Sequence, residues 1–112
     1  MEDEISMEVV KSISEMEERC TVAKRIRIEV SEGAGKAIGK YKSQVCDTSN
    51  GCNYLWICPG DRVGVTAVPF AGWKFGYWTL NGNPVSIEPE TSIQLYKGTI
   101  GAHFTPERTR TK

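Results

Sequence analysis

Histidine is scarce in this sequence, with His103 the only one among 112 residues. A G-x-S-x-G nucleophile motif is missing as well. The stretch GAGKAIGK contains glycine and lysine, but it lacks the G-x4-G-K-[ST] spacing of a phosphate-binding loop and lies between predicted strands. These absences predict that the protein is not an enzyme, has no catalytic residues, and has no cofactor or small-molecule substrate.

Metal-ligand spacing is also missing. Three of the four cysteines follow a C-x5-C-x5-C pattern rather than the C-x2-C of zinc knuckles, and only His103 could add a nitrogen ligand. The three aspartates are scattered and do not have calcium-loop spacing. We therefore predict that the chain has no metal site.

Long apolar runs are absent, and none approaches the roughly 20 residues that span a bilayer. The opening MEDEISMEVV is acidic and lacks the basic and apolar regions of a signal peptide. We expect no membrane insertion, and a cytoplasmic or virion location unless a leader has been removed.

Charge is present but segregated. Residues 1–18 carry seven acidic residues and one lysine, a net charge of −6, whereas residues 19–112 carry thirteen basic and seven acidic residues, a net charge of +6. A solvated helix face explains this pattern, and so does docking of the acidic arm on the basic body, either within one copy or head to tail between copies.

Apolar residues recur with helical spacing near the N-terminus. Steps of three and four residues link Ile5, Val9, Ile13, Met16 and Cys20. We predict an acidic amphipathic helix over residues 1–20, whose stripe needs a surface to cover. That surface is the β body or a second copy, which makes the stripe a candidate partner contact.

Period-two alternation replaces the helical pattern after Thr21. Strands are predicted at 21–30, 37–45, 62–68, 73–80, 84–87, 92–96 and 99–104, with Asn81-Gly82 as a hairpin turn. Residues 44–58 form an apparent cysteine-bearing insertion, and residues 107–112 a disordered basic tail. The predicted fold class is α+β: one small, mostly antiparallel β domain at 21–106 with the N-terminal helix.

The stretch PGDRVGVTAVPFAGWKFGYWTLNGNPVS, followed by GTIGAHFTP, resembles the divergent internalin-type B-repeat of bacterial surface proteins. The matching features are a Gly-Asp before a strand, an Ala-x-Pro, a Gly-aromatic-x-Phe-x-x-Trp hairpin, an Asn-Gly turn and a closing Ala-x-Phe strand. They fall at Gly60-Asp61, Ala67 and Pro69, Gly72 to Trp78, Asn81-Gly82, and Ala102 with Phe104. The upstream IRIEVSEGAGKAIG extends the resemblance to about residues 26–106.

The resemblance implies a β-grasp-like fold and an extracellular stalk, spacer or adhesive module, with no catalytic position. Three departures weaken the functional transfer: a single copy, the insertion at 44–58, and the acidic segment at 1–20.

Aromatic residues concentrate in GWKFGYWTLNGNPV. Strict alternation puts Trp73 and Phe75 on one face and Trp78 on the other, so the strand is either covered on both sides or bulged at Gly76. We predict that the structural core includes Trp73, Phe75, Trp78, Ala102 and Phe104. On the last strand His103 then faces the solvent. Trp56, Tyr54, Tyr41 and Tyr77 lie outside the repeat's core positions, and Trp56 is a candidate partner contact.

The cysteines leave alternatives open. A disulfide within the insertion joins Cys46 to Cys52 or to Cys58, or the thiols are free or buried. A second pair, in which Cys20 ties the helix to the insertion, is a further alternative.

Three functions follow. The first is a non-catalytic structural or protein-interaction module that self-associates through its N-terminal helix, as a homodimer for example. The second is nucleic-acid binding by basic residues near exposed aromatics, namely Arg25, Arg27, Lys36, Lys40, Lys42 and Lys74. The third, a glycan-binding module, would use Trp56 and Tyr54.

Overall fold

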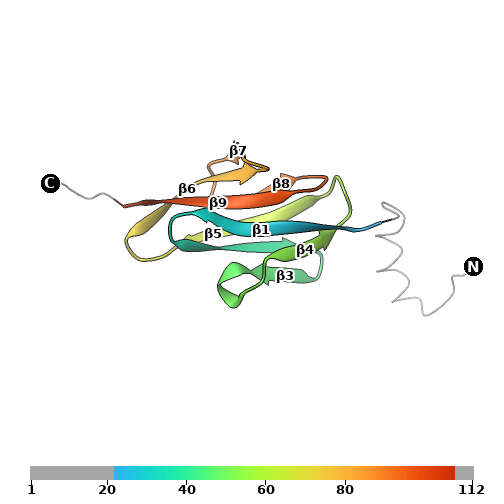
Figure 1. Cartoon of the computed structure of the whole chain (residues 1–112), viewed down its shortest axis with the longest axis horizontal. Helices are drawn as coiled ribbons and strands as arrows, with labels where there is room; N and C mark the ends of the chain where they lie inside the picture. The colour runs from blue at the N-terminus through green and yellow to red at the C-terminus, as the bar shows by residue number, and fades with distance from the viewer. Residues whose placement is uncertain (1–21, 108–112) are drawn as a thin grey trace, which may run out of the picture.

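A computed structural model describes residues 22–107, which form nine β-strands and one three-residue 3-10 helix (Figure 1). The elements in chain order are β1 (Lys24–Glu32), β2 (Gly35–Tyr41), β3 (Gln44–Asp47), η1 (Thr48–Asn50), β4 (Tyr54–Ile57), β5 (Arg62–Pro69), β6 (Trp73–Leu80), β7 (Asn83–Ser86), β8 (Glu90–Gln94) and β9 (Thr99–Pro106).

The strands build two sheets. The five-stranded sheet has the order β4-β1-β9-β6-β7, and the four-stranded sheet has the order β3-β2-β5-β8. Neighbouring strands pair antiparallel except β1 and β9, which are parallel. In Figure 1, β1 and β9 run side by side in front of β2 and β5.

One hydrophobic core lies between the two sheets. Its buried members come from both: Ile26, Ile28, Leu55, Ile57, Trp78, Ile100, Ala102 and Phe104 from the five-stranded sheet, and Ala37, Tyr41, Cys46, Val63, Val65, Ala67 and Ile93 from the other. Gly39 lets the sheets approach closely, because a Cβ there would strike Ile28 and lie 2.9 Å from Leu55 Cδ1. The architecture is a β-sandwich.

The predicted fold class is wrong. We expected an α+β, β-grasp-like domain, but residues 22–107 form strands joined by turns and loops, with one 3-10 turn and no α-helix. Each sheet turns its apolar face to the other sheet, so neither needs a helix to cover it. The predicted helix at 1–20 lies outside the described residues, and so do Ile5, Val9, Ile13 and Met16.

Strand β6, which has large apolar side chains on both of its expected faces, contains a bulge. The β6–β9 register shifts between Phe75 and Tyr77, which makes Gly76 the extra residue and confirms the bulged alternative. As a result Phe75 and Trp78 both face inward, with ring centroids 5.2 Å apart. Trp78 is fully buried, whereas Trp73 and Phe75 are partly buried against the core.

Candidate functional site

The outer face of the five-stranded sheet carries the polar side chains that form the candidate site. On the central strand β9, Ile100, Ala102 and Phe104 are buried in the core. Because side chains alternate along a strand, Gly101 and His103 belong to the outer face.

Both strands beside β9 carry an extra residue at the level of His103. On β1 the register shifts between Val30 and Glu32, so Glu32 pairs with His103 and Ser31 is the extra residue. On β6 the bulge at Gly76 places Tyr77 opposite His103. Bulges re-aim side chains and are over-represented beside active sites. Here two of them gather polar groups around one imidazole.

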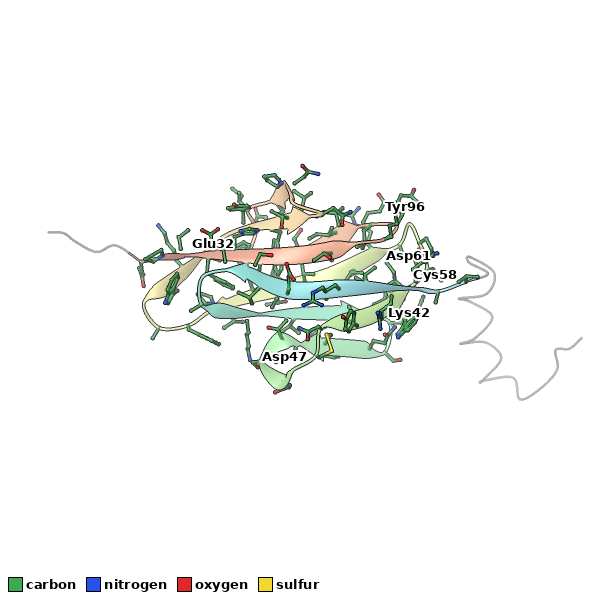
Figure 2. All side chains as sticks on the ribbon, viewed as in Figure 1. Glu32, Lys42, Asp47, Cys58, Asp61 and Tyr96 are labelled. Atoms are coloured by element: carbon green, nitrogen blue, oxygen red, sulfur yellow. A yellow bond between two sulfur atoms is a disulfide. The ribbon has the colours of Figure 1, made fainter. Side chains whose placement is uncertain are left out.

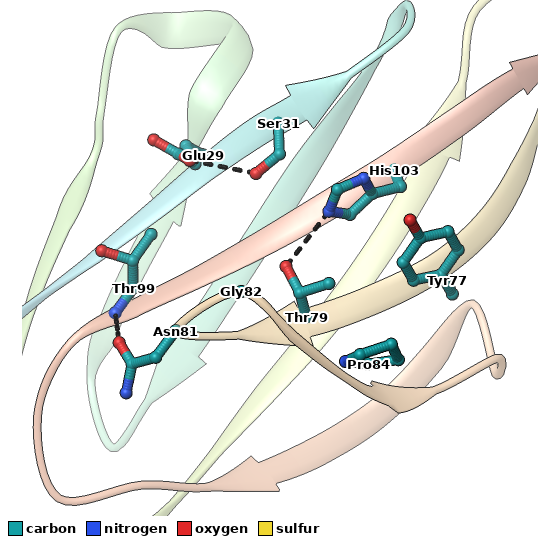
Figure 3. A pocket seen from close by; sticks show the side chains of 9 residues that line it. All are labelled: Glu29, Ser31, Tyr77, Thr79, Asn81, Gly82, Pro84, Thr99 and His103. Atoms are coloured by element: carbon teal, nitrogen blue, oxygen red, sulfur yellow. Dashed lines mark hydrogen bonds between the residues drawn. The ribbon is translucent and has the colours of Figure 1, made fainter.

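His103 is held at both ring nitrogens. Its Nδ1 lies 3.0 Å from Oε1 of Glu32, which is labelled in Figure 2, and its Nε2 lies 3.1 Å from Thr79 Oγ1 (Figure 3). A carboxylate can only accept, so Nδ1 donates its hydrogen to Glu32, whereas the Thr79 hydroxyl lies within hydrogen-bond distance of both Nε2 and the Gly101 carbonyl oxygen. The Tyr77 ring stacks on the imidazole at 4.4 Å. The orientation of the ring is therefore fixed by contacts at both nitrogens and on one face.

Glu32, His103 and Thr79 follow one another as carboxylate, imidazole and hydroxyl, the same order of groups that activates a hydroxyl nucleophile in some enzymes. Thr79 Oγ1, however, lies 3.4 Å from the Gly101 carbonyl oxygen as well, and Thr79 is only 5% exposed. Thr79 therefore holds the imidazole in place and is itself buried on the outer side of the sheet.

A depression opens over β1, β9 and β6, with a volume of about 570 Å³ (Figure 3). Its lining residues are Glu29, Ser31, Tyr77, Thr79, Asn81, Gly82, Pro84, Thr99 and His103. The absence of a side chain at Gly101 leaves room for two of these lining groups, since a Cβ there would strike Ser31 Oγ and lie 2.8 Å from Thr79 Oγ1. We call this feature the histidine depression.

An ion pair connects the histidine depression to the neighbouring surface. Arg27 Nε lies 3.0 Å from Glu29 Oε1, and Ser31 Oγ donates to Glu29 Oε2 at 3.0 Å. The hydrogen bond to Glu29 is the main reason that the pKa of the Arg27 guanidinium is raised above its ordinary value. The negative charge of the Glu29 carboxylate is thus balanced by the Arg27 guanidinium at the surface of the protein.

Arg25, Arg27, Tyr54 and Trp56 form a second group, which we call the β4 cluster. The register places Trp56 opposite Arg25 and Tyr54 opposite Arg27. The Arg25 guanidinium lies 4.2 Å from the Tyr54 ring centroid, and Arg27 donates to the Tyr54 hydroxyl at 3.1 Å. Trp56 is 52% exposed and Tyr54 is 40% exposed. Two aromatic rings and two guanidinium groups are thereby brought together at one edge of the sheet.

The exposed edge of β4 is partly paired by a side chain. The amide of Gln44 on β3 donates to the Trp56 carbonyl at 2.7 Å and accepts from the Trp56 amide at 3.0 Å. It takes the place of a strand partner at this residue. Gln44 also links the two sheets across the cysteine-bearing segment.

The predicted disulfide within the insertion is confirmed as Cys46–Cys52 (Figure 2). It joins the end of β3 to the loop before β4. Cys58 is fully buried and is not a free thiol. Nearby, Asp47 caps η1 by accepting hydrogen bonds from the Ser49 hydroxyl and amide, and these bonds lower the pKa of the Asp47 carboxyl.

The structure separates the other predicted nucleic-acid contacts from the β4 cluster. Lys36 and Lys40 lie on β2 of the four-stranded sheet, and Lys36 Nζ is 3.4 Å from Asp47 Oδ2. Lys42 follows β2, and Lys74 lies on β6. Asn81 and Gly82 form the β6–β7 turn with φ of 53° and 89°.

Sequence reasoning missed the histidine depression. His103 was expected to face the solvent, but its side chain is only 16% exposed because Tyr77, Thr79 and Glu32 cover it. Glu32 and Thr79 were not singled out at all. The signal available in the sequence was the break in alternation at Ser31 and Gly76.

Over residues 22–107 no group of three or more His, Cys, Asp or Glu side chains is arranged to hold a metal ion. Within the same residues there is no helix with the length and hydropathy of a membrane span. No family model, curated protein or solved structure matches the chain. The resemblance to the internalin-type repeat therefore stays a prediction.

Proposed function

We propose that this protein is a non-catalytic protein-interaction module that self-associates, with the β4 cluster of one copy binding the acidic N-terminal segment of another. The observation that carries the proposal is the prebuilt group of Arg25, Arg27, Tyr54 and Trp56. Tryptophan, tyrosine and arginine dominate the binding energy of protein interfaces. The rigid sandwich holds these side chains in place before a partner arrives, which reduces the entropic cost of binding.

Charge complementarity selects the partner. Arg27 is paired with Glu29, but Arg25 has no carboxylate within ion-pair distance among residues 22–107. A partner segment rich in carboxylates would supply one, with methylene groups to cover the Trp56 ring. Residues 1–18 have this composition, with seven acidic residues and a net charge of −6. Such a head-to-tail contact is heterologous, so it generates rings or open chains.

The proposal also agrees with the resemblance to stalk and adhesive repeats, which implies a spacer or binding role without catalysis. The sandwich would act as the scaffold and the β4 cluster as the contact.

Light scattering coupled to size-exclusion chromatography tests self-association on the full chain. At about 50 mM salt the mass should rise above 12.5 kDa with concentration, and it should fall toward the monomer near 500 mM salt because exposed charges are screened. Arg25→Gln and Trp56→Ala should each weaken association. The matched controls Lys97→Gln and Tyr96→Ala change exposed residues outside the β4 cluster and should leave it unchanged.

A monomeric mass at every salt and protein concentration would refute self-association. Association that persists in both Arg25→Gln and Trp56→Ala would place the contact elsewhere on the surface.

Single-stranded nucleic acid is the second candidate partner, because the β4 cluster also combines stacking rings with guanidinium groups. Binding of a mixed-sequence oligonucleotide would weaken steeply with salt as counterions are released. The dispersal of Lys36, Lys40 and Lys42 onto the other sheet disfavours this candidate. A Trp56-dependent shift of such a probe at about 50 mM salt would restore it.

A further inference from the structure

We propose that the histidine depression binds one pyranose ring of a neutral saccharide. The proposal goes beyond self-association and does not depend on the β4 cluster. It rests on the volume of the depression, its unused hydrogen-bonding groups and its compensated charge.

Several groups around the histidine depression have hydrogen-bonding capacity to spare. Among residues 22–107, the hydroxyls of Tyr77 and Thr99 have no hydrogen-bond partner. Glu29 accepts one hydrogen bond at each oxygen, from Arg27 and Ser31, and a carboxylate has further lone pairs. A ligand in the depression thus meets both donors and acceptors. A sugar hydroxyl is itself both, so it matches a mixed set of this kind.

The charge balance argues against ionic ligands. Glu29 is paired with Arg27 at 3.0 Å, and Glu32, which is hydrogen-bonded to His103, is not among the residues that line the depression. A cation would need an uncompensated carboxylate, and an anion would have to lie beside Glu29. A neutral polar ligand avoids both costs.

The shape fits a compact ring. About 570 Å³ is within the range of small-ligand sites. Gly101 leaves the space that the Ser31 hydroxyl occupies, since any Cβ there would strike Ser31 Oγ. The Tyr77 ring stands at one wall, fixed by its stack on His103, and offers an apolar surface for the C–H groups of a sugar. Figure 3 shows Tyr77, Thr79 and His103 around the same opening as Glu29 and Ser31.

Nuclear magnetic resonance titration of the ¹⁵N-labelled full chain tests the proposal directly. The probes are the methyl glycosides of glucose, galactose, mannose, N-acetylglucosamine and N-acetylgalactosamine, each to about 50 mM. We expect at least one to shift the amide signals of Ser31, Thr79 and Gly101, while those of the four-stranded sheet stay in place.

Two conservative variants remove one hydroxyl each. Tyr77→Phe and Thr99→Val should each raise the dissociation constant about threefold to tenfold, the effect of one lost hydrogen bond. The matched controls Tyr96→Phe and Thr91→Val change residues outside the depression and should leave the dissociation constant unchanged.

Three results would overturn the proposal. The first is the absence of shifts with all five probes at about 50 mM. The second is unchanged affinity in both Tyr77→Phe and Thr99→Val. The third is loss of binding in Trp56→Ala, which would put the sugar on the β4 cluster instead.

Discussion

Removing the Cys46–Cys52 disulfide would test how firmly the segment between β3 and β4 is held. The bond joins residues six positions apart. The loop-closure entropy of so short a loop corresponds to about 2.2 kcal/mol at 25 °C. Because Cys46 is fully buried and Cys52 only partly, Cys52→Ser removes the bond while the Cys46 sulfur stays in the core.

Thermal unfolding followed by circular dichroism measures the effect. For a domain of this size, about 2.2 kcal/mol corresponds to a fall in Tm of roughly 9–18 °C relative to the oxidised protein. Hydrogen exchange gives a local readout. The Trp56 amide, which donates to the Gln44 side chain at 3.0 Å, should exchange faster in Cys52→Ser.

A reductant provides the control. When both proteins are fully reduced, the difference in Tm between them should disappear, because neither then has the bond. A Tm within about 3 °C of the oxidised protein would refute the loop-closure argument. A difference that persists under reduction would instead come from contacts of the Cys52 sulfur, which lies 3.6 Å from the Tyr54 carbonyl oxygen.

Three further predictions concern the core, acid stability and catalysis. Gly39→Ala should lower the free energy of unfolding in urea by about 1–3 kcal/mol, because side chains of the opposite sheet fill the place of its Cβ. Gly64→Ala is its control, and an equal loss there would contradict the reason given. The hydrogen bonds from Ser49 lower the pKa of Asp47, so their stabilisation is present above about pH 4 and lost as the pH falls through the folded pKa. In Asp47→Asn the free energy of unfolding should fall less as the pH is lowered below about 4. An unchanged dependence on pH would exclude Asp47 as the source of the loss. Wild type should hydrolyse p-nitrophenyl acetate no faster than His103→Asn, and a His103-dependent burst of product would contradict the non-catalytic proposal.

Much of the strand pattern could be predicted because it depends on neighbouring residues. The predicted strands at 62–68, 73–80 and 99–104 agree with β5, β6 and β9 to within two residues. Asn81-Gly82 adopts positive φ at both residues, as a tight β-hairpin requires. Gly76 marked the bulge because both faces of its strand were apolar.

The turn between β2 and β3 could not be predicted in the same way. We expected one strand over 37–45, but the chain turns at Lys42, whose φ is 54°. Neither Lys42 nor Ser43 is a residue that favours positive φ. The turn is set by tertiary pairing: β2 needs β3 on one side and β5 on the other.

The fold class was missed for a related reason. Alternating apolar residues indicate that a strand has a buried face, but they do not indicate whether a helix or a second sheet covers it. The glycines on β2 are the physical clue to a sheet, since Gly35 and Gly39 lie against Phe104 and Ile28 of the opposite sheet.

The histidine depression shows how two local irregularities produce a site that neither strand encodes alone. In a regular strand Glu32 would point inward after Ser31, and Tyr77 inward after Gly76. Each extra residue reverses that direction, so a carboxylate and an aromatic ring reach His103 from opposite sides. Glu32 and His103 are 71 residues apart in the chain, and only the parallel pairing of β1 with β9 brings them to 3.0 Å. It follows that each bulge accommodates one extra residue without changing the pairing around it: without Gly76, Phe75 and Tyr77 would be consecutive, and alternation would still turn Phe75 to the core and Tyr77 to His103.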